Sequence, residues 1–228
     1  MKRTVVLASL LLATALARAD IVVEQKMESA MLNGNVTMKV KGDKARMDMP
    51  SPVGGSQTMI IDNASGEIIT LMHAQKMAMK MNINAIKQQA EAQQKAAGID
   101  PAKMEAPKAT GKKEKVGEWN AEIYEYAVGP MKGRLWVSKD FQNGKAINDQ
   151  INAVSAKMAA GGMDPTKLNV PGMVVKTEMD TPGGKFTTTL VKAVEQDVPA
   201  GEFVAPADYK EMAMPATPGA VPAPAPAK

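Results

Sequence analysis

Apolar and polar residues alternate over much of residues 20–82, and methionine occupies many of the apolar positions. The alternation is clearest at Met77, Met79 and Met81, and Met38 holds an equivalent position in an earlier segment. Successive side chains of a β-strand point to opposite faces of its sheet, so this pattern predicts strands with one apolar face. Turns rich in Gly, Asn, Asp and Pro separate these segments and favour a meander of antiparallel hairpins.

Two segments lack this alternation and favour helices. Residues 83–97 are rich in Ala, Gln and Lys and contain neither Gly nor Pro, which suits a helix. Residues 145–160 carry an apolar stripe whose members recur every three or four positions, the spacing of one buried helix face. The stripe consists of Ile147, Ile151, Val154 and Met158.

These patterns predict a single α+β domain over residues 20–212, with two helices and an antiparallel sheet of about eleven strands. The predicted strands are residues 20–27, 35–41, 44–49, 57–62, 67–72, 76–81, 116–128, 132–138, 172–179, 185–195 and 202–209. Residues 105–115 are rich in lysine and are expected to form a mobile loop. The final residues, 213–228, are mostly Pro and Ala and are expected to form a disordered tail.

The first nineteen residues have the features of a cleavable export signal. A basic start is followed by an apolar run at residues 5–16, which is too short for a membrane-spanning helix, and by the cleavage motif Ala17-Arg18-Ala19. The chain has no cysteine, so the processed N-terminus offers no thiol for a lipid anchor. We therefore expect a periplasmic protein that begins at Asp20, without a transmembrane segment or a disulfide.

Removal of this signal also changes the charge balance. The whole chain has 28 basic and 24 acidic residues, and loss of Lys2, Arg3 and Arg18 leaves 25 basic residues, a net charge of +1. The mature chain has no sustained basic patch, and its aromatic residues are two Trp, three Tyr and three Phe. Nucleic acid is therefore a poor candidate for a partner.

Catalytic chemistry has little support in this sequence. The chain has one histidine, His73, and no cysteine, so a thiol nucleophile is excluded and any histidine base must be His73. His73 lies in a turn between two predicted strands, and no serine stands in a nucleophile-elbow motif. No phosphate-binding loop is present either. We expect a protein without catalytic residues and without a cofactor.

The methionines allow three interpretations. Methionine is flexible and polarizable and suits surfaces that accept apolar ligands of variable shape, but it also fills closed cores. A third possibility is a site for Cu(I), because thioether ligands select this ion. The residues for such a site are Met72, His73, Met77, Met79 and Met81. Alternate residues of one strand are about 6.6 Å apart, which is too far for three of them to reach one ion on a straight strand.

Several short motifs resemble those of an uncharacterised family of periplasmic proteins. They are Gly42-Asp43-Lys44 with Arg46, Ile60-Ile61-Asp62-Asn63, Leu135-Trp136-Val137-Ser138-Lys139, the Gly183-Gly184 turn, and Phe203-Val204-Ala205-Pro206 with Tyr209. That family is similar in architecture to the LolA-like carriers of outer-membrane lipoproteins. The resemblance implies a curved, unclosed half-barrel whose two helices cover its concave face and bind acyl chains between them and the sheet. Arg46 is the nearest counterpart of the lid arginine of those carriers, and its alternative is an exposed charge on a strand.

We therefore expect non-catalytic binding of a hydrophobic ligand, either a lipid or the acyl chain of a lipoprotein, in an apolar cavity. The expected lining residues are Met38, Met77, Met79, Met81, Ile147, Ile151, Val154 and Met158. The partner would be a lipid or an acylated protein. The methionine-rich copper site and a structural role in the cell envelope are the alternatives, and the sequence leaves the oligomeric state open.

Overall fold

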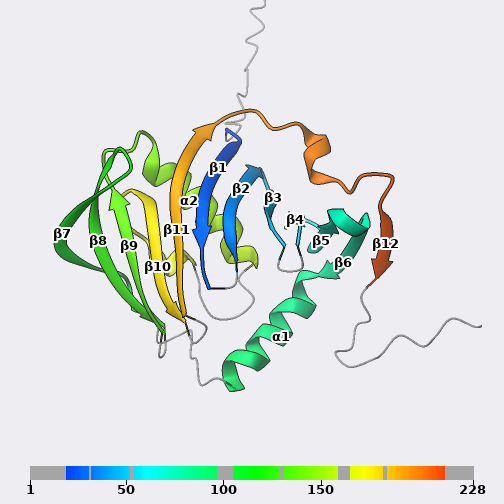
Figure 1. The fold of residues 1–228 in the computed structure, drawn as a ribbon, viewed down its shortest axis with the longest axis horizontal. Coiled ribbons are helices and arrows are strands. Elements are labelled where there is room, and N and C mark those ends of the chain that lie inside the picture. The colour runs from blue at the N-terminus through cyan, green and yellow to red at the C-terminus, as the bar shows by residue number, and fades with distance from the viewer. Residues whose placement is uncertain are drawn as a thin grey trace, which may run out of the picture.

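The computed structural model describes residues 19–30, 32–51, 54–96, 105–128, 131–158, 165–181 and 184–213. Its main feature is one curved sheet of twelve strands (Figure 1). The strands are β1 (Ile21–Glu28), β2 (Asn33–Lys41), β3 (Lys44–Pro50), β4 (Ser56–Asp62), β5 (Glu67–Met72), β6 (Met77–Asn82), β7 (Lys108–Val116), β8 (Trp119–Val128), β9 (Met131–Ser138), β10 (Met173–Thr181), β11 (Gly184–Glu195) and β12 (Lys210–Ala213). The helices are α1 (Ile83–Ala96) and α2 (Gly144–Met158), with short 3-10 turns η1 (His73–Gln75), η3 (Pro165–Leu168) and η4 (Ala200–Phe203).

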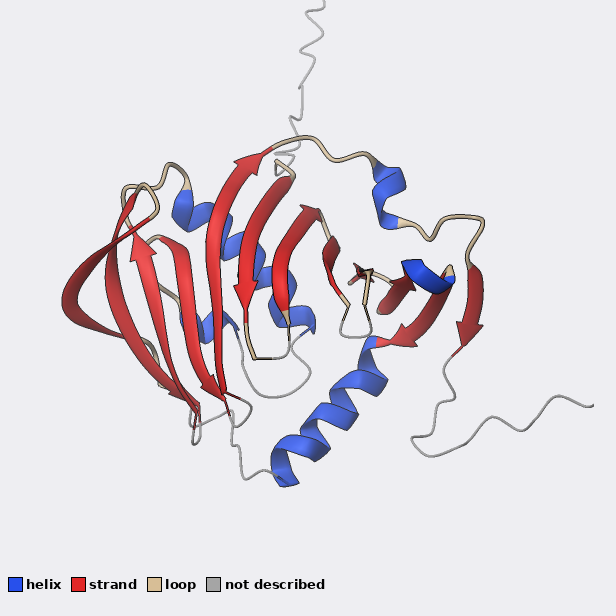
Figure 2. Ribbon diagram, in the orientation of Figure 1, coloured by secondary structure: helices blue, strands red, loops and turns tan. Residues whose placement is uncertain are grey.

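The strand order is β12-β6-β5-β4-β3-β2-β1-β11-β10-β9-β8-β7, so the first strand of the chain lies near the middle of the sheet. Strands β2 to β6 follow one another on one side of β1. Helix α1 comes next in the chain, and β7 then forms the opposite edge of the sheet. From that edge, β8 to β11 follow in order back to β1. Neighbouring strands are antiparallel except for β12, which pairs parallel to β6. The sheet curves without closing (Figure 2).

Helix α2 lies against one face of the central strands, behind β11, β1 and β2 in Figure 1. Ile147 and Val154 are buried there in one apolar cluster with Val40, Ile61 and Trp136, which come from both sides of β1. We call the face that α2 covers the concave face. The apolar stripe of α2 thus joins the two sides of the sheet into one core.

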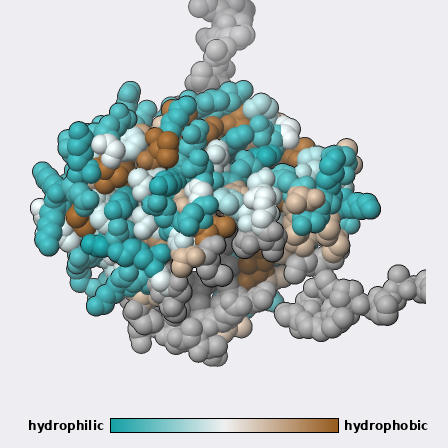
Figure 3. All heavy atoms as spheres, viewed as in Figure 1, coloured by the Kyte–Doolittle hydropathy of each residue, from teal (hydrophilic) through white to brown (hydrophobic). Residues whose placement is uncertain are grey.

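A second apolar cluster covers the opposite, convex face of β4 to β6. Residues 196–209, which we call the strap, cross this face and bury Val198 and Phe203 against Ile60 and Leu71. The strap is the orange segment that leads from β11 to β12 in Figure 1. Seen from the side opposite to α2, the molecular surface is mostly hydrophilic with small hydrophobic patches (Figure 3). Both faces of this part of the sheet therefore carry buried apolar residues.

The predicted fold class is confirmed: the protein is α+β, with a curved antiparallel sheet and two helices. The predicted helices 83–97 and 145–160 correspond to α1 and α2. The predicted loop at residues 105–115 is wrong, because most of this segment forms the edge strand β7. Its exposed lysines hid it from a search for apolar alternation, although lysine is common on edge strands, where it discourages pairing with other chains.

A further correction concerns the C-terminal end of the domain. Residues 202–209 were predicted as a strand, but they form the end of η4 and an irregular part of the strap, and the strand follows as β12. The predicted signal, residues 1–19, and the predicted tail, residues 213–228, lie almost entirely outside the described residues. Within the described part of the chain, no helix is both long enough and apolar enough to cross a membrane.

Candidate functional site

The alternation of β2 to β6 places eight methionines on the concave face. We call this set the methionine face. It consists of Met38, Met47, Met49, Met59, Met72, Met77, Met79 and Met81. The predicted lining residues of β2 and β6 belong to it. The methionines of β3 and β4 were not predicted as lining residues, because only the pairing of the strands brings them beside the others.

The methionine face is organised in rows that run across the sheet. Met38 lies opposite Met47, and Met47 lies opposite Met59. The same row continues through Thr70 to Met79 on β6. Directly opposite residues of antiparallel strands have Cβ atoms about 5 Å apart, so neighbouring methionines of this row are within contact distance.

A second row carries Met49, Gln57, Met72 and Met77 on β3 to β6. A third row, on the other side of the first, consists of Val40, Ala45, Ile61, Ile68 and Met81. The four aliphatic residues of this third row, Val40, Ala45, Ile61 and Ile68, are buried in the core. All eight methionines, in contrast, are only half-buried. The sheet therefore changes from closed core to partly accessible surface within one row.

The methionine face also lacks charge. The concave positions of β2 to β6, strands that are described throughout, hold no Asp, Glu, Lys, Arg or His. The charged residues of these strands point to the convex face, where Lys39 pairs with Glu202 and Lys44 pairs with Asp62. An apolar ligand on the concave side would thus meet thioether and aliphatic groups without displacing an ion pair.

The predicted lining residues of α2 lie in the main core. Ile147 and Val154 are 4% and 6% exposed, and Ile151 is half-buried against the same cluster. Ile147 also borders a cavity of about 500 Å³ together with Trp119 and Phe141, whose ring centroids are 5.7 Å apart. The side chain of Met158 lies outside the described residues. The stripe is therefore packed against the sheet over the part that is described.

The residues of the alternative copper set do not all meet. His73 donates or accepts through both ring nitrogens: Nε2 lies 2.8 Å from the Thr58 hydroxyl and Nδ1 lies 2.5 Å from the Tyr209 hydroxyl. Thr58 points to the convex side, whereas Met72 and Met77 are on the concave side. In this arrangement the imidazole is engaged on the other face of the sheet, and a soft ion on the methionine face would have sulfur as its main ligand.

His73 belongs to a polar network that ties the strap to β3 and β4. The Thr58 hydroxyl, which is fully buried, donates to Asp48 over 2.5 Å. Arg46 donates to both carboxylate oxygens of Asp48 and to the carbonyl of Glu202 in the strap. Burial raises the pKa of Asp48, but its hydrogen bonds with Arg46 and Thr58 outweigh this effect and hold the pKa below its ordinary value. The proposed lid arginine, Arg46, thus faces the strap and not the concave side.

The concave face on the other side of β1 is charged. Glu178 on β10 is 14% exposed and pairs with three cations: Arg134 at 2.6 Å, Lys176 at 2.8 Å and Lys185 at 3.5 Å. Burial raises the pKa of Glu178, but the hydrogen bond from Lys176 and the three positive charges lower it below the ordinary value of 4.5. Sequence reasoning missed this group, because its members come from three strands.

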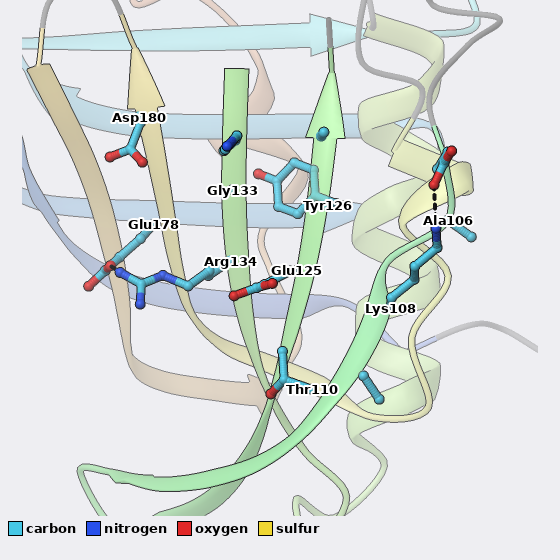
Figure 4. A pocket seen from close by; sticks show the side chains of 13 residues that line it. Ala106, Lys108, Thr110, Glu125, Tyr126, Gly133, Arg134, Glu178 and Asp180 are labelled. Atoms are coloured by element: carbon cyan, nitrogen blue, oxygen red, sulfur yellow. Dashed lines mark hydrogen bonds and ion pairs between the residues drawn. The ribbon is translucent and has the colours of Figure 1, made fainter. Parts of the chain in front are cut away.

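The indole of Trp136 forms the base of this charged group. The Lys176 Nζ lies 4.2 Å from the ring centroid and the guanidinium carbon of Arg134 lies 5.3 Å from it. The Trp136 Nε1 donates to Glu114 over 2.8 Å. A cavity of about 720 Å³ adjoins the group, and Figure 4 shows Arg134 extending toward Glu178 along its wall. Neither this cavity nor the one beside Trp119 is lined by the methionine face.

A model of one protein family matches residues 22–209, almost the whole described domain. The family is a domain of unknown function, DUF4412. The chain belongs to this family. This membership confirms the expected relation to an uncharacterised family, and it carries no function of its own. No curated protein matches the sequence.

Solved structures show a similar fold. An uncharacterised conserved protein of Thermus thermophilus has a TM-score of 0.52 and 8% identity, over 87% of this chain and 92% of that chain. The lipoprotein LppX of Mycobacterium tuberculosis has a TM-score of 0.44 and 10% identity, over 79% of this chain and 88% of that chain. PNGF-II has a TM-score of 0.39 and 12% identity, over 86% of this chain but only 31% of that chain. At these identities the likeness concerns the fold alone.

Proposed function

We propose that this protein binds an apolar ligand without catalysis, and that the methionine face holds it. The ligand class is a lipid or the acyl chain of a lipoprotein, and the place of action is the periplasm, after export through the N-terminal signal. The observation that supports this proposal most directly is the accessible part of the concave face. There, seven half-buried methionines form two rows without a charged residue among them, and Met81 ends the row beside them.

The physical chemistry of such a face suits apolar ligands. Each Å² of apolar surface removed from water contributes about 25 cal/mol, so an acyl chain that covers about 200 Å² of the face would gain about 5 kcal/mol before ordering costs. Methionine has three rotatable side-chain bonds and adapts to chains of different shape. The row of Val40, Ala45 and Ile61 beside it is already closed by the core and would act as a rigid floor.

The chemistry of the described residues also favours a binding role over catalysis. The single histidine of the sequence, His73, uses both ring nitrogens to hold Thr58 and Tyr209. The half-buried Asp48 is neutralised by Arg46 in the same network. These groups are arranged to hold the strap on the sheet, and they lie on the face opposite to the methionines.

Displacement of a fluorescent fatty-acid probe tests the proposal. We expect the parent protein to bind the probe, and the variant Met77→Leu/Met79→Leu/Met81→Leu to keep its affinity within about 1 kcal/mol, because leucine preserves apolar area. The variant Met47→Gln/Met79→Gln should lose about tenfold in affinity, or 1.4 kcal/mol. The control Met131→Gln changes a half-buried methionine of the convex cluster on β9 and should leave binding unchanged.

Failure of the parent protein to bind the probe would contradict the proposal. Equal losses in the Met131 control and in the double Gln variant would also contradict it, since the ligand would then not lie on the methionine face.

Native mass spectrometry of protein purified without detergent identifies what the face carries in the cell. N-terminal sequencing of exported protein should find Asp20 first, and an uncleaved or lipid-modified end would contradict the proposed processing.

A further inference from the structure

Met38, Met47 and Met59 lie directly opposite one another on three neighbouring strands, β2, β3 and β4. Hydrogen-bonded strands are about 4.8 Å apart, so the two outer backbones are separated by about 9.6 Å with Met47 between them. A methionine sulfur stands more than 2 Å beyond its Cβ on a flexible stem. The three sulfur atoms can therefore converge above Met47 without any change in the backbone. Along a single strand the same side chains would be about 6.6 Å apart per step.

The surroundings of this triplet select the kind of ion that it can hold. Thioether sulfur is a soft ligand that prefers Cu(I), whereas Mg²⁺, Ca²⁺ and Mn²⁺ require oxygen ligands. The concave positions of β2 to β6 carry no carboxylate or imidazole. Across the described part of the chain, no group of three His, Cys, Asp or Glu could hold a metal ion. A monovalent ion among neutral ligands also brings only one charge to a half-buried site.

We propose that Met38, Met47 and Met59 form a three-sulfur site for Cu(I). The site differs from the set that the sequence suggested, which included His73 and three methionines of a single strand. It is built by strand pairing, and its three members are half-buried, with Met38 and Met59 also packed against the main core cluster. The inference stands independently of lipid binding, because a metal ion needs sulfur atoms whereas an acyl chain needs only apolar area.

Anaerobic titration of the full-length mature protein with Cu(I) against a coloured chelator tests the site. The variant Met38→Leu/Met47→Leu/Met59→Leu keeps the apolar volume and removes all three sulfurs. The control Met49→Leu/Met72→Leu/Met77→Leu removes three sulfurs from the neighbouring row. We expect the parent to bind one equivalent of Cu(I), the first variant to lose at least tenfold in affinity, and the control to stay within about threefold of the parent, a loss of less than 1 kcal/mol.

X-ray absorption of the loaded parent should show a copper ion surrounded by sulfur. Absence of Cu(I) uptake by the parent, unchanged uptake by the first variant, or equal loss in the control would each overturn the site. Circular dichroism and thermal unfolding of both variants confirm that they fold. The fatty-acid probe is measured on the parent protein as well: probe binding without Cu(I) uptake overturns the copper site alone, and Cu(I) uptake without probe binding overturns the lipid proposal alone.

Discussion

The two sides of the concave face, separated by β1, carry opposite kinds of side chain. On β2 to β6 the sheet presents methionine without any charge, whereas on β9 to β11 it presents Glu178 among three cations above Trp136. Helix α2 packs on both sides through one core cluster. The methionine side gains its interactions from area and can exchange partners, whereas the charged side depends on fixed distances between ions. This difference supports the proposal that the methionine side is the ligand-binding surface.

The convex faces differ as well. Behind the methionine side, the strap and a network around Thr58 and His73 close the sheet with hydrogen bonds. Behind the charged side, an apolar cluster with Tyr124, Leu135 and Val170 does so. The polar network is thus placed behind the apolar concave surface, and the apolar cluster is placed behind the charged one. Three substitutions test how the stability is divided between these regions.

The largest effect is expected where α2 joins the two sides. Replacing Ile147, which is 4% exposed, by Asp places an unpaired charge in the shared core. We expect the free energy of unfolding to fall by about 3–5 kcal/mol, and both sides to unfold together because they share this cluster. Chemical denaturation followed by tryptophan fluorescence measures the change.

The control for this substitution is Ala153→Asp, at an exposed position of the same helix. It should change the stability by less than about 0.5 kcal/mol. Comparable losses of stability in the two variants would contradict the burial of Ile147 and the exposure of Ala153 on α2.

An intermediate effect is expected from Thr58→Val on the convex face. Valine has nearly the same shape but cannot bond Asp48 or His73, so two half-buried hydrogen-bonding groups lose a partner. We expect a loss of about 2 kcal/mol in unfolding free energy. Thr70→Val, on the concave face of the adjacent strand, is the matched control, because Thr70 is half-buried among methionines and should lose little. Equal effects would show that the network does not stabilise the strap.

The smallest effect is expected from Glu178→Gln on the charged side, and it should depend on pH. Because the folded-state pKa of Glu178 lies below its ordinary value of 4.5, the ionised carboxylate stabilises the fold above pH 4.5. We expect the parent to be more stable than the variant by about 1 kcal/mol at pH 7.

This difference should shrink as the pH falls from 4.5 through the folded-state pKa, since the protonated carboxyl resembles the amide. Urea unfolding of both proteins at several pH values measures it. A difference that stays constant down to pH 2, or that grows in acid, would contradict the assigned role of the three cations. The part of the sheet around Glu178 would then be stabilised by packing and not by these ion pairs.

Local patterns predicted much of the fold. Alternation identified most strands and the methionines of β6, and helical spacing identified the buried stripe of α2. Edge strand β7 escaped because its exposed side chains carry no apolar period. The strand at the C-terminal end was misplaced because residues 202–209 are apolar enough to suggest a strand, but in the strap they pack as a turn and an irregular segment.

The sequence by itself determined which residues share a face, because a period of two or of 3.6 follows from local backbone geometry. It could not determine which strands become neighbours. Register placed Met47 and Met59 beside Met38, brought Arg134 to Glu178, and turned Arg46 and His73 toward the strap. These contacts join residues far apart in the chain, and they exist only once long-range pairing has closed the loops between them.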